Sequence, residues 1–204
     1  MHDHPVVALR VVADRSRLAL FTMSAALGIS LVAGNAAAQQ QHHLSVGAGW
    51  YNPGGDDFRE TESGPGLDIG VRFAAGERLY LALGSQWNSH GVDFSDDDWN
   101  VLAIFVEPSL VLATGAAVEP FIAGRVGWLR QSITALSGRR TANGVGFGGF
   151  VGLRVPVASR LAVEVAVPFY RVSFGNVEVD GVERPDSDSS GRAFGIRVAL
   201  NIGF

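Results

Sequence analysis

Between residue 44 and the end of the chain, large apolar side chains recur at every second position, with small residues between them. The final segment shows this most clearly, since Ile196, Val198 and Leu200 are separated by Arg197 and Ala199. A period of two is typical of a β-strand, because successive side chains of a strand point to opposite faces of the sheet. The pattern predicts eight strands, near residues 44–51, 67–73, 79–86, 102–112, 121–128, 145–154, 161–169 and 194–204.

The face opposite the large apolar residues consists mostly of Gly, Ala and Ser, with one or two charged residues per strand. In a soluble sandwich or barrel the outward face is polar and the large apolar residues point inward. Here the small face carries too few charges to be a water-facing exterior, but it suits the crowded interior of a narrow barrel. The large apolar face must then point outward into lipid, where only a closed barrel leaves no strand edge unpaired.

The connections between the predicted strands alternate between long and short. The long ones lie near residues 52–63, 88–98, 131–142 and 175–190, and the short ones near residues 74–77, 113–118 and 156–159. Long exterior loops and short periplasmic turns are typical of outer-membrane barrels. The chain is therefore predicted to be all-β: a closed antiparallel eight-stranded up-and-down transmembrane β-barrel with four longer extracellular loops.

Residues 1–38 are expected to be a cleavable secretory signal peptide, which leaves residues 39–204 as the outer-membrane barrel domain. A positive segment, an apolar stretch and a small-residue cleavage pattern follow one another, at Arg10, Arg15 and Arg17, at residues 18–33 and at residues 36–38. The alternative is a retained membrane anchor. Its apolar stretch of 16 residues falls short of the about 20 that a spanning helix needs.

The 204-residue chain contains no cysteine and no lysine, and its 16 basic residues are outnumbered by 20 acidic ones. Without cysteine, a disulfide framework, a cysteine-based zinc site and a lipid anchor on cysteine are excluded. The lack of a basic excess argues against nucleic-acid binding. Motifs for phosphate loops, dinucleotides and metalloproteases are absent from the sequence, so no cofactor and no metal site are expected.

Catalysis would need a nucleophile, a base and an orienting acid within reach of one another. The only loose candidates are His90, Asp93 and Ser95, on a segment predicted to be a loop. The chain is therefore expected not to be an enzyme. His42 and His43, near the start of the barrel domain, could contact a metal. They are better explained as part of a solvated segment that precedes the first strand.

Aromatic residues gather at the ends of the predicted strands, where a transmembrane barrel carries its interfacial girdles. The predicted girdle comprises Trp50, Trp87, Trp99, Trp128 and Phe169 on the exterior side, and Phe73 and Phe204 on the periplasmic side. Any one of these residues could instead be ordinary core packing, but their joint placement favours a girdle.

In three kinds of segment, the sequence resembles the small eight-stranded outer-membrane β-barrel family, which includes the OmpX type and the OmpA-type membrane domain. These segments are the turn-and-strand segments at residues 77–81 and 159–163, the strand at residues 119–124, and the terminal strand that ends at Phe204. The resemblance covers all of residues 39–204. In that family the terminal aromatic residue implies recognition by the barrel-assembly machinery.

The barrel is expected to be a monomer in the outer membrane of a diderm bacterium. Its expected contacts are outer-membrane lipid and lipopolysaccharide. Arg139 and Arg140, in the third predicted loop, suit the phosphates of the outer leaflet, because a guanidinium can bind a phosphate through two hydrogen bonds.

Seven charged residues fall on the inward face of the predicted strands: Asp68, Arg72, Glu107, Arg125, Arg154, Glu164 and Arg197. An eight-stranded barrel is just wide enough for side chains to fill it, and an isolated buried charge costs several kcal/mol. These charges are therefore expected to pair with one another or with trapped water. A turn centred near residues 115–116 predicts that Glu107 faces Arg125, and Glu164 can bridge Arg154 or Arg197.

Such a network is predicted to plug the lumen, with a gated ion path as the alternative. The predicted role of the protein is structural or concerns surface interaction, through membrane integrity or adhesion. The alternatives are a narrow pore for small solutes and a lipid-modifying barrel enzyme.

Overall fold

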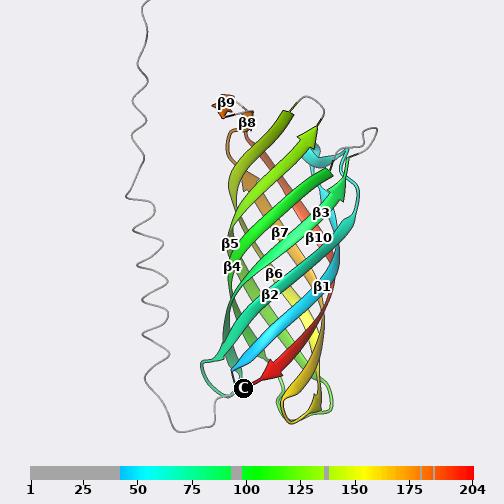
Figure 1. The fold of residues 1–204 in the computed structure, drawn as a ribbon. Coiled ribbons are helices and arrows are strands. Elements are labelled where there is room, and N and C mark those ends of the chain that lie inside the picture. The colour runs from blue at the N-terminus through cyan, green and yellow to red at the C-terminus, as the bar shows by residue number, and fades with distance from the viewer. Residues whose placement is uncertain (1–41, 93–97, 136–137, 180, 186) are drawn as a thin grey trace, which may run out of the picture. The chain divides into compact units, whose positions relative to one another are not determined.

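The computed structural model describes residues 42–92, 98–135, 138–179, 181–185 and 187–204. The expected signal peptide at residues 1–38 lies outside this part of the chain. Most of the described residues lie in β-strands (Figure 1). No helix among the described residues is long and apolar enough to cross a membrane.

Eight long strands make up the body of the structure. They are β1 (His43–Gly54), β2 (Gly64–Ala74), β3 (Leu79–Gly91), β4 (Asp98–Val111), β5 (Glu119–Ala135), β6 (Gly138–Ala158), β7 (Leu161–Phe174) and β10 (Ser189–Gly203). A short 3-10 helix, η1 (Asp56–Phe58), follows β1. A small hairpin of β8 (Glu178–Val179) and β9 (Val182–Glu183) lies between β7 and β10.

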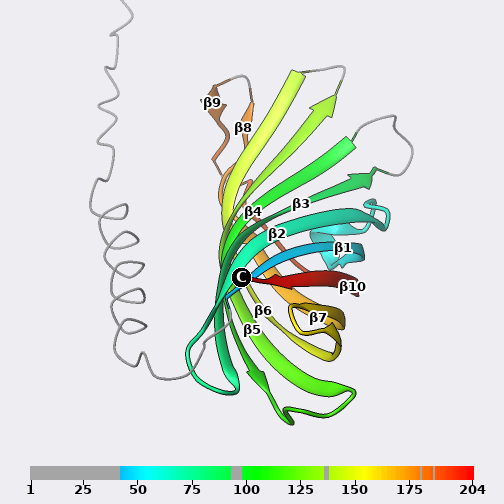
Figure 2. The ribbon, with the colours of Figure 1, turned by 60° about the horizontal axis from the view of Figure 1, so that its bottom comes forward.

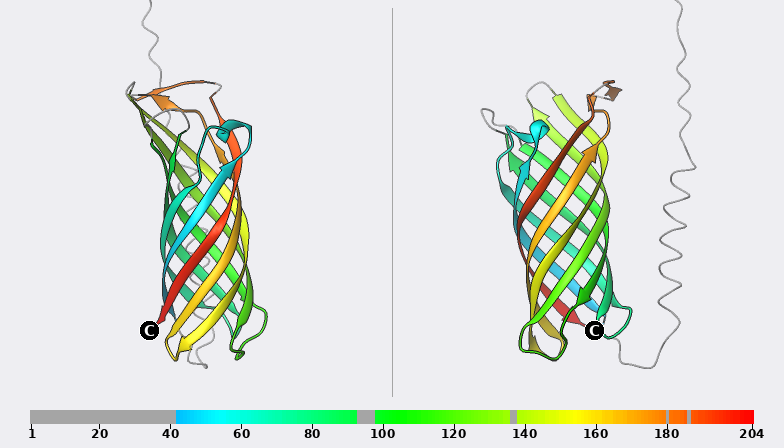
Figure 3. Two further views of the ribbon diagram at one scale, coloured as in Figure 1. Left: turned by 90° about the vertical axis from the view of Figure 1, so that its right-hand side faces the viewer. Right: turned by 180° about the vertical axis from the view of Figure 1, so that it is seen from behind.

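The long strands form one closed sheet. Each pairs antiparallel with the long strand before and after it, and β10 returns to pair with β1. The closing register places Leu44 opposite Ile202 and Trp50 opposite Ile196. Figures 1 and 3 show the resulting barrel, whose strands are tilted against its axis. The predicted fold, a closed antiparallel eight-stranded β-barrel, is confirmed.

The short turns lie at one end of the barrel, together with the C-terminus (Figure 2). There the backbone N–H of Phe204 donates to the carbonyl oxygen of His42, at 2.9 Å. In the β4–β5 turn, Gly115 has a φ of +77°, a left-handed conformation that glycine adopts without steric cost. Its N–H donates to the carboxylate of Glu119, at 2.8 Å.

The third exterior connection differs from the sequence-based prediction of a long loop at residues 131–142. β5 and β6 instead stay paired out to Ala135 and Gly138, with Gln131 opposite Ala142. Both of these inward-facing residues are buried. The alternation of large apolar side chains ends here although the pairing continues, because a strand that rises above the membrane has water on its outer face.

The large apolar side chains point away from the barrel axis. Ile104, Phe147 and Val151, in the middle of their strands, are about 60% exposed. Most other large apolar residues of that face are also exposed. The opposite face of every strand, with its charges and small residues, lines the lumen. The prediction that the large apolar face of the strands points outward, with the small and charged residues inside, is confirmed.

Inward aromatic rings fill the lumen beside glycines of neighbouring strands. A Cβ atom on Gly84 would lie 2.7 Å from the ring of Phe105, and one on Gly152 would lie 2.6 Å from the ring of Phe121. Any larger residue at these two positions would collide with the ring. The glycines of the small face therefore provide the space in which bulky inward side chains pack.

Candidate functional site: the charged layer inside the barrel

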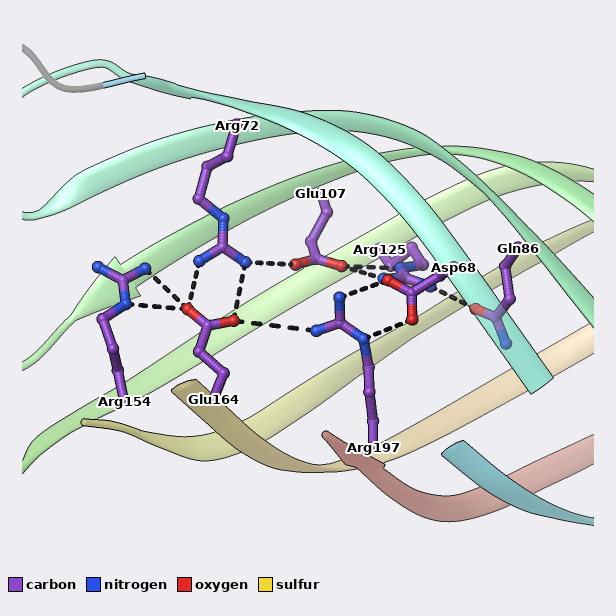
Figure 4. Close-up of polar contacts among 8 residues, drawn as sticks. All are labelled: Asp68, Arg72, Gln86, Glu107, Arg125, Arg154, Glu164 and Arg197. Atoms are coloured by element: carbon purple, nitrogen blue, oxygen red, sulfur yellow. Dashed lines mark hydrogen bonds and ion pairs between the residues drawn. The ribbon is translucent and has the colours of Figure 1, made fainter. Parts of the chain in front are cut away.

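The seven charged residues predicted to point inward all lie inside the barrel. They come from β2 (Asp68 and Arg72), β4 (Glu107), β5 (Arg125), β6 (Arg154), β7 (Glu164) and β10 (Arg197). The most exposed of them, Arg125, is only 7% exposed. Figure 4 shows that they form one connected layer of hydrogen bonds and ion pairs across the lumen. We call this set the charged layer.

Glu164 is the centre of the charged layer. Both of its carboxylate oxygens accept hydrogen bonds from Arg72 on the opposite wall. Arg154, its direct neighbour on β6, donates from Nε to Oε1 at 2.9 Å. The Nη1 atom of Arg197 lies 3.9 Å from Oε2. One carboxylate is thus shared by three guanidinium groups.

Glu107 and Arg125 face each other across the β4–β5 hairpin, as expected from the position of the turn. The Nε atom of Arg125 donates to Oε2 of Glu107 at 2.8 Å, and its Nη2 atom donates to the same oxygen. Nη1 of Arg125 donates to Gln86 at 2.5 Å. Arg72 reaches Oε1 of Glu107 at 3.4 Å, which joins this pair to Glu164.

Asp68 and Arg197 form the third part of the charged layer. Arg197 donates from Nε and Nη2 to the two oxygens of Asp68, at 2.8 and 2.5 Å. A Cβ atom on Gly47, opposite Asp68 on β1, would lie 2.4 Å from that carboxylate. Any larger residue at this position would have to displace the carboxylate from the place where it binds Arg197.

Aromatic rings surround the arginines of the charged layer. The guanidinium carbon of Arg125 lies 3.6 Å from the centre of the Phe105 ring and 4.6 Å from that of Phe150. Arg154 lies 4.8 Å from the ring centre of Tyr80. Such cation–π contacts are favourable, and more so away from water. Sequence reasoning missed Phe105 and Phe150 as partners, although both share the inward parity of the charges on their strands.

The charged layer has an excess of positive charge. Its four arginines face three carboxylates, so the seven residues carry a net charge of +1. Each carboxylate contacts at least one arginine, and Glu164 contacts three. Because burial makes an unpaired charge costly, this arrangement of ion pairs holds all seven side chains in place.

Most of the predicted aromatic girdle lies on the outer face. Exposed side chains are found at Trp50, Trp87, Phe169 and Phe204, and half-buried ones on the same outward parity at Phe73 and Trp128. The prediction for Trp99 is wrong. This residue is buried inside the barrel, stacks on Phe58 with ring centres 5.0 Å apart, and donates from Nε1 to Gln131. It shares the parity of Glu107 on β4, so its position in the strand directs it inward.

Two of the candidate histidines, His90 and His42, pack against aromatic rings in the structure. His90 is buried against Trp99, and its Nδ1 atom lies 3.1 Å from the backbone oxygen of Glu62. Asp93 and Ser95 lie outside the described residues. The ring of His42 packs against Phe73 and Phe204 at the turn end of the barrel. No cluster of three potential metal-ligating side chains occurs in the described part of the chain.

No protein-family profile and no curated protein sequence matches the chain. Solved structures do match it. Neisserial surface protein A superimposes with a TM-score of 0.60 at 14% identity, over 80% of this chain and 97% of the other. The attachment invasion locus protein Ail of Yersinia pestis superimposes with a TM-score of 0.54 at 9% identity, over 82% of this chain and 100% of the other.

A second structure of Ail, in complex with the heparin analogue sucrose octasulfate, gives a TM-score of 0.54 at 11% identity, again over 82% of this chain and 100% of the other. At these identities the likeness concerns the fold. The chain thus has the fold of the small eight-stranded outer-membrane barrels.

Proposed function

We propose that this protein is an outer-membrane barrel whose lumen is closed by the charged layer and whose role, in membrane integrity or adhesion, is carried by its exterior surface. The observation that supports this most is the connection of residues from six strands into one layer (Figure 4). A solute moving along the axis would have to separate several buried ion pairs. The apolar outer face supports placement in lipid, because no other solvent tolerates it.

Conductance in planar bilayers tests whether the lumen is closed. The wild-type protein is expected to give no stepwise conductance. The double variant Glu107→Ala/Arg125→Ala is expected to give steps, because it removes two side chains that cross the lumen while the net charge of the charged layer stays at +1. The matched control is Asp56→Ala/Arg59→Ala, which removes an exposed ion pair at the loop end. This control variant should give no conductance steps.

A narrow pore for small solutes is the second candidate, and one observation favours it. On the turn side of the charged layer, the side-chain polar atoms of Ser45, Ser109 and Asn201 are buried and have no hydrogen-bond partner among the described residues. Buried polar atoms that lack a protein partner usually form hydrogen bonds with buried water molecules, and water inside the barrel would be consistent with a pore. Regular conductance steps from the wild-type protein would favour the pore and contradict the closed barrel.

Adhesion is supported by the fold shared with Ail, whose structure includes a complex with a heparin analogue. In this chain, Arg140 of β6 and Arg184 after β9 line one cavity of about 400 Å³ at the loop end. Both side chains are exposed. Arginine suits sulfate esters for the same reason as phosphates, since it presents two parallel N–H donors.

Binding of heparin to the protein in lipid nanodiscs tests this surface role. The variant Arg140→Ser/Arg184→Ser is expected to bind at least about tenfold more weakly than wild type at low salt, because two charge-assisted contacts are lost. The matched control is Arg130→Ser/Arg171→Ser, which removes two exposed arginines of β5 and β7 that lie outside that cavity. Equal loss in both double variants would show that net charge alone attracts the polymer.

A further inference from the structure

A second feature of the lumen lies on the loop side of the charged layer. There the barrel encloses a cavity of about 70 Å³ whose walls are mainly apolar and include several aromatic rings. Phe105, Tyr170 and Phe174 line it from β4 and β7, and Tyr51 lines it from β1. Arg125 of the charged layer also contributes to the lining. Apolar pockets with a few convergent polar groups are the usual form of a small-molecule site.

Two polar atoms of this cavity lack partners. The hydroxyl groups of Tyr51 and Tyr170 are buried and form no hydrogen bond with any residue that the structure describes. A buried hydroxyl without a partner is uncommon and costs free energy. Both are donors that can bind an acceptor oxygen. The charged residues that line the cavity, Arg125 and Arg192, are both arginines, so an anionic acceptor is favoured there.

The loop end of the cavity is closed by an aromatic ring of the chain itself. Phe58, from η1, is inserted into the barrel mouth, where it stacks on Trp99 and lies 6.3 Å from the ring centre of Phe174. The same two rings, Phe58 and Trp99, also line an outer cavity of about 490 Å³ between the exterior loops. Phe58 therefore separates the inner cavity from the outer one.

The Phe58 ring is buried in an apolar cluster with Trp99 and Phe174, and it is held there by packing. η1 has only three residues, and a carboxylate oxygen of Asp57 accepts a hydrogen bond from the backbone N–H of Ser190 at 2.8 Å. The ring packs over Gly191, where a Cβ atom would lie 2.3 Å from it. A cavity that binds benzene has a volume of about 150 Å³, so the inner cavity alone is too small for a free ring. It becomes large enough if Phe58 moves out.

We infer that the loop side of the lumen is a binding site for a small aromatic carboxylate, which takes the place of the Phe58 ring beside Trp99 and directs its carboxylate to the hydroxyl groups of Tyr51 and Tyr170. The ring of Phe58 shows how an aromatic ligand fits this mouth. The two free donors and the two arginines of the lining select an anionic head group over a neutral one. The site is independent of the surface role proposed above.

The binding of 4-fluorobenzoate tests the inference, measured by fluorine NMR with the protein purified from outer membranes and placed in lipid nanodiscs. Saturable binding above that of empty nanodiscs is expected for the wild-type protein. Phe58→Ala is expected to bind at least about tenfold more tightly, because the site no longer has to expel its own ring. A shift of heated against unheated samples on gels verifies that each variant is folded.

The hydroxyl groups are tested by Tyr51→Phe/Tyr170→Phe, which keeps both rings. This variant should bind 4-fluorobenzoate at least about tenfold more weakly, since a hydrogen bond to a charged group is lost at each position. The control is Tyr80→Phe, whose ring contacts Arg154 and His43 instead of this cavity. It should bind like wild type.

Three outcomes would overturn the inference. The first is the absence of saturable binding in both wild type and Phe58→Ala, which would mean that the cavity holds water only. The second is equal affinity in the Tyr80→Phe and Tyr51→Phe/Tyr170→Phe variants. The third is tighter binding of fluorobenzene than of 4-fluorobenzoate by the wild-type protein, since the site would then select apolar rings and not carboxylates.

Discussion

Replacement of Glu164 by Gln is expected to lower the free energy of unfolding of the barrel by about 3–5 kcal/mol, the range found when one partner of a buried ion pair is removed. Glu164 contacts Arg72, Arg154 and Arg197, so its neutralisation raises the excess positive charge of the charged layer from +1 to +2. The amide can still accept a hydrogen bond, but it cannot compensate these cations. Urea-dependent unfolding from lipid vesicles measures the effect.

Glu119→Gln is the matched control. Glu119 is also buried and also faces inward, but it accepts a hydrogen bond from the backbone N–H of Gly115. It forms no ion pair with the described residues. Because a Gln oxygen can accept the same bond, the expected cost is about 1 kcal/mol or less. Similar losses in the Glu164 and Glu119 variants would show that the charged layer contributes little through its charge.

The members of the charged layer could be predicted because strand periodicity determines which side chains share a face. The pairing of Glu107 with Arg125 also followed from the sequence, because a single tight turn determines which residues of β4 and β5 lie opposite each other. Both inferences use only local geometry. They needed no knowledge of how the barrel closes.

The sharing of Glu164 among three arginines could not be predicted in the same way. Arg72 and Glu164 are 92 residues apart and approach each other from opposite walls, so their contact depends on the width and stagger of the closed barrel. The misplacement of Trp99 has a different cause. It was assigned to the girdle by residue type, whereas its parity on β4 already directed it inward.

The loop side of the lumen was also missed by sequence reasoning. Phe58 comes from η1, outside the period-2 segments, and enters the barrel from the loop end. No alternation pattern describes a side chain that enters along the axis. The ring is recognisable only once β4 and β7 bring Trp99 and Phe174 to the same end of the lumen.

An arginine on the outer face tests the orientation on which the whole fold depends. Val165 is 46% exposed and lies between Leu153 and Val198, which are also exposed on their strands. In lipid, Val165→Arg is expected to cost about 2–4 kcal/mol, as arginine does near the midplane on the lipid face of a barrel. In detergent the cost should be smaller, because the charged end of the side chain can reach water.

The same substitution at Val182 provides the control. Val182, in the exterior β8–β9 hairpin, is 64% exposed against 46% for Val165, so an arginine at either site has open space and exposure alone predicts only a small difference in cost. If the surroundings of Val165 are lipid and those of Val182 are water, Val182→Arg should change the free energy of unfolding by no more than about 0.5 kcal/mol. Equal refolding of both variants into vesicles would mean that the face of Val165 is wet, and the apolar residues around it would then need another partner. Only the difference between the two sites isolates the solvent, because the residue removed and the residue introduced are the same.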